Sequence, residues 1–320
     1  MNIPITQTKA WQKLQDDLGI ISFFEKEAHY QYLAIRKKSL TGNYLYLPYG
    51  PVADSKEGFK DAIKSLKFLA KKENIDFIRV EPQNPEFTKL LPSKTVKSID
   101  LNPKETWVLD LTPEKSEIIK NFSQGTRTRF NNYAKKGLRV LKTTQSSEIE
   151  HLVSLQQKLA RQKNINTFSK NYLETELKQP FATLYLVEYA PSQAEIPIPA
   201  NDPSPAPGQI LAASLFFDHE DTRYYMQSAA DGKFKKLPAT VALLTEAIFD
   251  AKAKGITRFD FWGIAPEDAP KDHPWFGFTN FKKSFGGHEV HYAGTYDIVI
   301  HPARYKAYQL SRRLNRFIRH

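Results

Sequence analysis

A lysine set among aromatic residues is the strongest candidate for chemistry in this sequence. Lys282 has phenylalanines at −4, −1 and +3, which are Phe278, Phe281 and Phe285. On a helix such neighbours would keep water away from the lysine, and a desolvated ammonium can stabilise an oxygen that gains negative charge in a reaction. The alternative is a surface lysine whose methylene stem lies along apolar groups. The segment 261–287 alone leaves both interpretations open.

Other kinds of site are disfavoured. The run His288-Glu289-Val290-His291 does not have zinc-motif spacing, and in a strand its two histidines would face opposite sides of the sheet. The chain has no cysteine, which excludes disulfides, thiolate ligands and cysteine nucleophiles. Residues 232–239 are basic but lack the glycines with which acyl-CoA enzymes bind pyrophosphate. We therefore expect no metal and no cofactor, and acyl-CoA is disfavoured as a donor.

Positive charge is concentrated in two stretches. The net charge is +11, and residues 127–142 and 302–320 contribute six cations each without an acid, so the rest of the chain is close to neutral. Concentrated basic stretches on a neutral body indicate a polyanionic partner; the alternative is a solubilising surface. The cations are Arg127, Arg129, Lys135, Lys136, Arg139, Lys142, Arg304, Lys306, Arg312, Arg313, Arg316 and Arg319.

The elements that must position these residues are a mixture of helices and strands. In the first half we expect helices over 11–18 and 57–72, strands over 20–26, 30–37, 44–47, 77–80 and 106–111, and a helical stretch to 136 broken near Gly125. Within that stretch Arg127, Asn131 and Lys135 would share one face. In the second half we expect strands over 138–142, 183–188, 210–217, 223–228, 258–262 and 292–300, and helices over 148–163, 170–177, 239–254 and 279–284.

The order of elements in the second half is that of the GNAT acyltransferase fold, an inference by analogy. The first half has a similar tail, because helix 57–72 leads into strand 77–80 as helix 239–254 leads into strand 258–262. An internal duplication and two unrelated α+β halves both remain open. Residues 190–208 contain six prolines, which predicts an exposed loop between two strands.

Length and composition fit a globular protein of about two domains. The 320 residues include 40 aromatics, too many to leave unburied, and no window is apolar enough for a membrane span. The first residues, Met1-Asn2-Ile3-Pro4-Ile5, have no basic or apolar leader, so secretion is not expected.

These residues resemble those of a known family, the Fem-type (FemABX) peptidoglycan-bridge aminoacyltransferases. The likeness is carried by Trp262-Gly263-Ile264 at a strand end, by the run from Phe281-Lys282 to Phe285-Gly286-Gly287, and by Gly294 to Asp297. It continues in the basic helix that ends in Lys135-Lys136-Gly137, in Leu47-Pro48-Tyr49-Gly50-Pro51, and in Gln7 with Trp11.

The resemblance implies an α+β fold with two GNAT-like domains in tandem. Domain 1 would span residues 1–137, with the C-terminal helix 302–320 packing back on it, and domain 2 would span 138–301. The implied activity is transfer of an amino acid from aminoacyl-tRNA to the stem peptide of a peptidoglycan precursor, either UDP-linked or lipid-linked. Such an enzyme would be cytoplasmic and would make peripheral contact with the inner face of the membrane without crossing it.

The resemblance also assigns residues. Lys282 would stabilise the carbonyl oxygen and Phe281 would shape the catalytic pocket. Departures from the family pattern are Tyr49 in place of a base and Gln15, with Lys13 nearby, in place of a phosphate-binding lysine. The substrate-binding residues would be Trp11, Lys13, Gln15, Tyr49, Gly50, Glu81, Trp262 and Gly263, and the tRNA-binding residues would be Arg127, Arg129, Lys135, Lys136, Arg312 and Arg313.

Two other functions remain open on the sequence. A GNAT-type N-acyltransferase could use a different activated donor, and RNase would then leave its activity intact. A non-catalytic, basic tRNA- or RNA-binding protein would keep its function when Lys282 is replaced.

Overall fold

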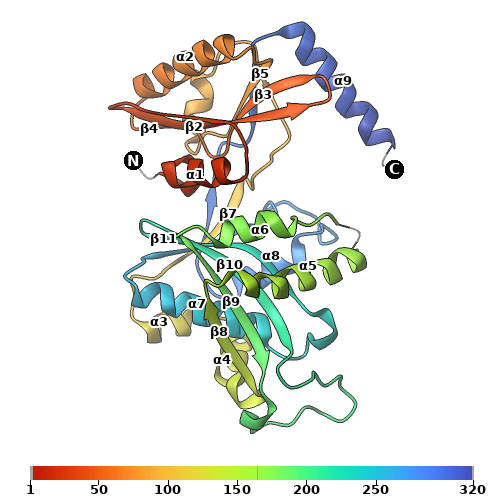
Figure 1. Cartoon of the computed structure of the whole chain (residues 1–320). Coiled ribbons are helices and arrows are strands. Elements are labelled where there is room, and N and C mark those ends of the chain that lie inside the picture. Colours follow the sequence, from red (N-terminus) through yellow and green to blue (C-terminus); the bar gives the residue numbers. More distant parts are fainter. Residues whose placement is uncertain (1–2, 164, 319–320) are drawn as a thin grey trace. The chain divides into compact units, whose positions relative to one another are not determined.

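The computed structural model describes residues 3–163 and 165–318, which form two compact units (Figure 1). The first unit contains Met1–Lys104 and His291–His320, and the second contains Glu105–Val290. Each unit is built around one seven-stranded sheet. None of the helices among the described residues is both long and apolar enough to span a membrane.

The first unit has the strand order β1-β2-β3-β5-β14-β6, with the short β4 beside β2. The strands β3 and β5 are parallel, and helix α2 connects them across a buried core that includes Leu45, Phe59 and Ile78. Helix α2 begins where the Ser55 side chain accepts a hydrogen bond from the Gly58 N–H. The elements are α1 (Lys9–Asp17), β1 (Ser22–Lys26), β2 (Tyr30–Ser39), β3 (Gly42–Leu47), β4 (Val52–Ala53), α2 (Lys56–Lys72), β5 (Phe77–Val80), β6 (Thr95–Lys97), β14 (Tyr296–Val299) and α9 (Pro302–Ile318).

A buried ion pair ties the end of the chain to this unit. Arg79 of β5 and Asp297 of β14 are both 1% exposed, and the guanidinium donates to the carboxylate at 2.7 and 2.8 Å. The Tyr305 hydroxyl of α9 donates to the same carboxylate at 2.9 Å, and Tyr305 and Tyr308 pack on Phe77. Helix α9 therefore packs on the first unit.

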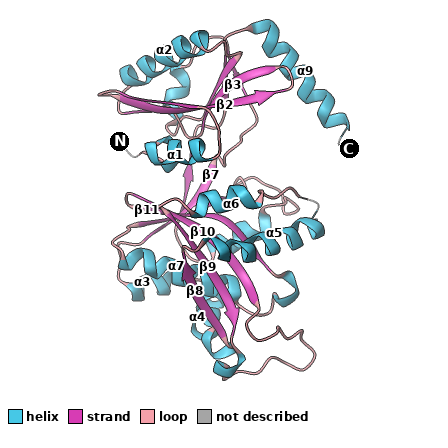
Figure 2. Ribbon diagram, in the orientation of Figure 1, coloured by secondary structure: helices cyan, strands magenta, loops and turns pink. Residues whose placement is uncertain are grey.

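The second unit has the strand order β13-β7-β12-β11-β10-β9-β8. Helices α5 and α6 lie on one face of the sheet and α7 lies on the other (Figures 1 and 2). The elements are β7 (Glu105–Asp110), α3 (Lys115–Asn121), α4 (Gln124–Asn132), β8 (Leu138–Thr143), α5 (Ile149–Lys163), α6 (Lys170–Leu177), β9 (Ala182–Tyr189), β10 (Ile210–His219), β11 (Thr222–Ala230), α7 (Ala239–Ala253), β12 (Arg258–Gly263), α8 (Phe276–Lys283) and β13 (His288–His291).

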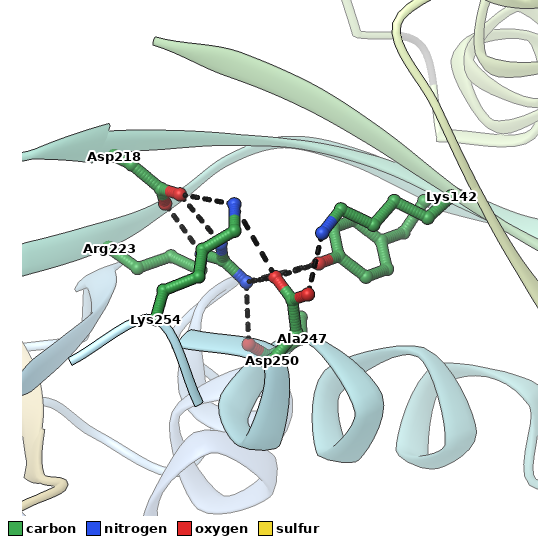
Figure 3. Close-up of polar contacts among 7 residues, drawn as sticks. Lys142, Asp218, Arg223, Ala247, Asp250 and Lys254 are labelled. Atoms are coloured by element: carbon green, nitrogen blue, oxygen red, sulfur yellow. Dashed lines mark hydrogen bonds and ion pairs between the residues drawn. The ribbon is translucent and has the colours of Figure 1, made fainter. Parts of the chain in front are cut away.

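A buried arginine joins β11 to the end of α7 (Figure 3). Arg223 has no exposed surface and donates to both carboxylate oxygens of Asp218 at 2.6 Å. It also donates to Asp250 and to the Ala247 carbonyl of α7, each at 2.8 Å. Two surface lysines complete the charge balance: Lys142 lies 2.5 Å from Asp250, and Lys254 lies 3.1 Å from Asp218. Partial burial of Asp250 would raise its pKa, but Lys142, Tyr185 and Arg223 lower it well below its usual range.

The unit boundaries differ from those expected. The sequence suggested breaks at 137/138 and 301/302, whereas the compact units meet at 104/105 and 290/291. The reason is strand pairing: β7 is antiparallel to β12, and Ile118 and Phe122, which follow β7, belong to the core of the second unit. At the other end β14 pairs with β5 of the first unit.

Most predicted elements are present, with corrections around strand ends and breaks. The predicted strand 292–300 is replaced by β13 and β14, which lie in different sheets. The helical stretch to 136 breaks at Phe122–Ser123, and α4 ends at Asn132, so Lys135 does not continue the face of Arg127 and Asn131. Gly137 does end the turn that follows, with a left-handed φ of 71°.

The two units repeat one arrangement, which makes both GNAT-like. In each, a parallel strand pair is joined by a helix, as β3-α2-β5 and as β11-α7-β12. In each, the second strand of the pair has an antiparallel neighbour drawn from the other half of the sequence, β14 beside β5 and β7 beside β12. The predicted fold class, α+β with two GNAT-like domains, is confirmed.

Candidate active site

The centre of the candidate site is a cavity that opens where two parallel strands separate. The strands β11 and β12 are paired only over Thr222–Tyr224 and Arg258–Asp260, and beyond that point they diverge. A cavity of about 430 Å³ lies there, and it is largely apolar. Its lining consists of Leu159, Lys163, Ala212, Ala213, Tyr225, Met226, Ser228, Ala229, Ala230, Thr240, Leu243, Trp262, Phe278, Phe281 and Lys282.

Lys282 is a buried base in the wall of this cavity. It is 8% exposed, and its Nζ donates to the Gly263 carbonyl at 2.6 Å. The ring of Phe278 lies 4.9 Å from the same nitrogen. Burial lowers the pKa of Lys282 to about 8, while the charge of Asp260 opposes this shift. The ammonium is therefore mostly present at neutral pH in a poorly solvated place.

The aromatic residues around Lys282 divide into two roles. Phe285 is fully buried and belongs to the core, and Phe281 packs on it edge to face with ring centroids 5.3 Å apart. Phe278 and Phe281 line the cavity beside Lys282. The neighbouring Lys283 has its Nζ 4.9 Å from the Trp107 ring and does not line the cavity. The helix thus presents one of its two lysines to the candidate site.

Two glycines fix the end of this helix. Gly286 and Gly287 have positive φ angles of 77° and 102°. A Cβ atom on Gly287 would lie 2.4 Å from the Val108 carbonyl oxygen of β7, which no side chain permits. The Trp107 indole also donates to the Gly286 carbonyl at 2.7 Å. This glycine pair therefore holds α8, and with it Lys282, against the sheet.

The backbone at the end of β12 is held in an unusual conformation. Trp262 has φ of 66°, which is rare for a residue other than glycine. Its N–H donates to the Asp260 carboxylate at 2.7 Å. Asp260 is buried, and desolvation raises its pKa to about 6 despite the nearby Lys282. Sequence reasoning missed Asp260; the signal was an acid between the two phenylalanines Phe259 and Phe261.

The predicted residues of the first unit form a second group. Trp11 and Gln15 are buried on α1, whereas Lys13 lies on its exposed face and pairs with Asp17 at 2.9 Å. Lys13 and Gln15 therefore occupy different sides of this helix. Trp262, Gly263, Phe281 and Lys282 are the predicted site residues that the second unit brings together.

Tyr49 and Gly50 form a tightly packed turn after β3. Tyr49 is buried with φ of 53°, and its hydroxyl donates to the Pro103 carbonyl at 2.9 Å. A Cβ on Gly50 would lie 2.3 Å from the Gln7 side chain, which itself binds the backbone of Leu33 and Pro48. This part of the predicted substrate-binding set has a clear packing role.

Glu81 also has a packing role. It is 3% exposed, and its carboxylate accepts hydrogen bonds from Tyr46 and the Asn102 amide at 2.9 Å and from Thr295 at 2.8 Å. Backbone N–H groups of Leu101 and Asn102 lie 3.3 Å away. The expected position near an acceptor is therefore not an open one, because these donors surround both oxygens.

The basic residues predicted to bind tRNA differ in whether their side chains already contact other groups of the protein. Arg127 donates to the carbonyls of Lys120 and Phe122, so it caps the end of α3. Lys135 lies 3.8 Å from Glu195, and Arg312 has its guanidinium 5.8 Å from the Tyr308 ring. For Arg129, Lys136 and Arg313 the structure shows no ion-pair partner among the side chains it describes. Arg319 lies outside the described residues.

A second cavity of about 480 Å³ was not foreseen. The proline-rich loop 190–208, predicted as an exposed loop, runs beside residues 232–238, and the two segments line this cavity together. Lys236 forms an ion pair with Asp202 of the loop. The lysines on its wall are Lys136, Lys233, Lys235 and Lys236. Among the described residues no three histidine or acidic side chains gather in a group that could hold a metal ion.

Comparison with known proteins gives one family match and several similar folds. Residues 202–313 match the FemAB family model. The fold is similar to the crystal structure of FemX, with a TM-score of 0.79 and 17% identity over 96% of this chain and 94% of that one. It is also similar to the C-terminal domain of a putative lysylphosphatidylglycerol synthetase from Agrobacterium fabrum, with a TM-score of 0.59 and 11% identity over 93% and 89% of the two chains.

A third similar structure is L-PGS from Bacillus licheniformis, with a TM-score of 0.58 and 12% identity over 98% of each chain. Among proteins with curated descriptions, none matches this sequence. The family match contains Trp262, Gly263, Phe281 and Lys282, and the FemX likeness extends over nearly the whole chain. Residues 202–313 of this chain are therefore similar to the FemAB family, and the chain as a whole shares its fold with FemX.

Proposed function

We propose that this protein transfers an aminoacyl group from aminoacyl-tRNA to an amine on the stem peptide of a peptidoglycan precursor, as in the formation of interpeptide bridges. The observation that carries the proposal is the buried Lys282 ammonium in an apolar cavity, inside the segment that matches the FemAB model. An ammonium in such a place suits a reaction whose transition state carries negative charge on a carbonyl oxygen.

The proposed reaction is acyl transfer from an ester to an amine. The neutral amine of the acceptor attacks the ester carbonyl carbon, a C–N bond forms, and negative charge develops on the carbonyl oxygen. The bond between that carbon and the ribose oxygen then breaks. The ribose oxygen takes up a proton, and the amine loses one, so the products are an amide and deacylated tRNA without any metal, thiol or other co-reactant.

Lys282 is suited to act on the carbonyl oxygen. A lysine ammonium has three donors, and among the described residues the Gly263 carbonyl is the hydrogen-bond acceptor recorded for it. Gly263 therefore fixes the position of Nζ and leaves donors for a substrate oxygen. Phe278 and Phe281 beside it exclude water, which strengthens the field of the charge.

The basic stretches give the proposed donor a place to bind. Arg129 and Lys136 in the second unit and Arg313 in the first would meet tRNA phosphates, and such contacts are weakened by salt. In the first unit, Trp11, Lys13 and Gln15 of α1 and the turn at Tyr49 and Gly50 remain candidates for the precursor. The cytoplasm would supply both substrates, and a lipid-linked precursor would add peripheral contact with the membrane face.

A transfer assay tests this proposal. The full chain is incubated with a mixture of charged tRNAs and either a UDP-linked or a lipid-linked muropeptide precursor, and the products are weighed by mass spectrometry. We expect the mass of one amino acid residue to be added to the precursor, and we expect RNase treatment of the donor to abolish this product. Product formation that survives RNase would instead indicate another activated donor, and no product with any charged tRNA would reject the proposed activity.

A further inference from the structure

Asp260 is a buried acid that the proposed reaction does not yet use. It is 3% exposed and stands at the last paired position of β11 and β12, opposite Tyr224, where the sheet opens into the cavity. On its other side it pairs with Val108 of β7, and the register between β12 and β7 shifts immediately after it, before Gly263. Asp260 therefore lies at the point where β11 and β12 begin to separate and the cavity opens.

Asp260 is linked to Lys282 through the backbone. Its Oδ1 accepts the Trp262 N–H at 2.7 Å, and Trp262 has a φ of 66°, a left-handed conformation that is unfavourable for a non-glycine residue. The next residue, Gly263, turns its carbonyl toward Lys282 and accepts from Nζ at 2.6 Å. Loss of the Asp260 acceptor would remove this hydrogen bond from the Trp262 N–H and would loosen the turn that presents the Gly263 carbonyl to Lys282.

Asp260 is also linked to Lys282 by charge. Its carboxylate is the charged group that favours the ammonium form of Lys282 against desolvation. The other charged groups of the region are placed differently, and Arg223 of β11 is already balanced by Asp218 and Asp250. Four further charged residues lie in this region. Arg258 on β12 acts on Asp260, and Lys163 of α5 lies on the cavity wall. Lys283 of α8 lies over Trp107, and Glu105 begins β7.

We propose that Asp260 is the positioning residue of Lys282: it holds the Trp262–Gly263 turn that receives the ammonium, and its charge keeps that ammonium protonated in the apolar cavity. The inference rests on the proposed function only in that Lys282 acts on the substrate. It assigns Asp260 no contact with the substrate. The backbone link and the charge link can be separated, because asparagine retains an acceptor for the Trp262 N–H but carries no charge.

The experiment compares Asp260→Asn, Asp260→Ala and Lys282→Met in the full chain. In Asp260→Asn the Trp262–Gly263 turn should persist while Lys282 loses its proton more easily. The transfer rate depends on protonated Lys282, so the rate falls on the alkaline side of the pH–rate profile. In Asp260→Asn we expect this alkaline limb to lie about one pH unit lower than in the wild type. In Asp260→Ala the turn is also released, so the rate should fall about 10²-fold at every pH, toward the loss in Lys282→Met.

A measurement without substrate separates this inference from the proposed function. Lysine labelled with ¹³C at Cε reports the titration of Lys282, whose signal is identified by its loss in Lys282→Met. We expect the wild-type signal to titrate near pH 8 and the Asp260→Asn signal to titrate lower. Asp268→Asn, an exposed acid eight residues further along, is the matched control and should change neither the titration nor the transfer rate.

Three outcomes are decisive. If Asp260→Asn shifts both the titration and the alkaline limb while Asp260→Ala is slow at every pH, the positioning role is supported. If the titration and the limb both stay where the wild type has them, the role is overturned, even where Asp260→Ala has lost stability. If even the wild-type protein transfers nothing, the proposed function fails, and the titration alone then decides whether Asp260 controls the charge of Lys282.

Discussion

At the scale of single residues, the pair Lys282 and Lys283 gives a direct test of the proposed oxyanion role. The two are neighbours on α8, but Lys282 is buried in the cavity wall and Lys283 lies over Trp107 away from it. Loss of one oxyanion donor typically costs about 10²–10³ in turnover. We expect Lys282→Met to lower the transfer rate by that amount with little change in tRNA affinity, and Lys283→Met to cost much less.

Stability provides the control for this comparison. Below pH 8 the folded protein must bury the Lys282 ammonium, which opposes folding. Thermal unfolding of Lys282→Met should therefore begin no earlier than that of the wild type. Equal losses of activity in both variants would reduce Lys282 to one member of a basic surface, and full activity in both would reject the oxyanion role.

The same scale shows where sequence reasoning succeeds and where it does not. The phenylalanines spaced around Lys282 make a desolvated lysine one of two interpretations, because i−4 and i+3 neighbours share a helix face, and its 8% exposure in the folded chain decides in favour of burial. Glu81 was assigned to the acceptor by resemblance alone, and the five donors around it come from segments 46, 101–102 and 295, which no local pattern brings together. Asp260 was missed for the same reason: its partner depends on the left-handed turn at Trp262.

At the scale of elements, the junction of β11 and α7 depends on Arg223. The side chain is fully buried between Asp218 and Asp250, so its removal takes the buried cation away from two partly buried carboxylates (Figure 3). Breaking a buried ion pair on one side typically costs about 3–5 kcal/mol. We expect Arg223→Met to lower the free energy of unfolding by that order in urea denaturation.

Lys254 is the matched control for that variant. It contacts the same two acids at 3.1 and 3.6 Å but is 42% exposed, so water replaces much of its contribution. Lys254→Met should cost less than about 1 kcal/mol. A loss of stability in Lys254→Met as large as in Arg223→Met would show that the pairing at the surface, rather than burial, holds this junction.

The cations of the basic stretch 127–142 have different roles, because some are bound within the protein and others are exposed. Arg127 caps α3 through the carbonyls of Lys120 and Phe122, so reversing its charge would disturb folding as well as binding. Arg129 is exposed on α4 and is the better probe. If it meets a tRNA phosphate, Arg129→Gln should weaken binding at every tRNA sequence and reduce the slope of log affinity against log salt by about one.

Arg139→Gln serves as the comparison for Arg129→Gln. It removes the same charge from the same stretch, but Arg139 is already paired with Glu188 at 2.5 Å on the surface of β8 and β9. The slope should then change little. Filter binding across a salt series measures both variants, and an unchanged slope in Arg129→Gln would remove this helix from the proposed tRNA surface.

At the scale of the whole molecule, each half of the sequence completes the sheet of the other. Strand β7 follows the first unit in sequence but pairs with β12, and β14 follows the second unit but pairs with β5. The domain boundaries at 137/138 and 301/302 rest on the family resemblance. The exchange of strands could not be predicted from the sequence, because it depends on pairings between residues far apart in the chain, such as Arg79 and Asp297, which are 218 positions apart.

The two GNAT-like units raise the question of whether the acyl donor is acyl-CoA or aminoacyl-tRNA. In the second unit the segment before α7 is where an acyl-CoA enzyme would bind pyrophosphate with backbone N–H groups. Here the N–H groups of Lys233, Phe234 and Leu237 already donate to Asp231 and to Phe234 within the segment, and Pro238 has none. The proline-rich loop is joined to the same segment by the ion pair of Asp202 with Lys236.

We therefore expect no saturable binding of acetyl-CoA to the full chain. The four lysines that line the cavity beside residues 232–238 would attract any anion weakly, and such attraction disappears with salt. The segment lacks the glycine pattern that lets backbone N–H groups approach a pyrophosphate closely. Titration calorimetry at about 0.15 M salt measures the affinity, with an acetyl-CoA-dependent GNAT enzyme as the positive control. Micromolar affinity that persists at high salt would show that the segment rearranges to bind pyrophosphate, and it would favour a CoA-dependent acyltransferase over the aminoacyl-tRNA reaction.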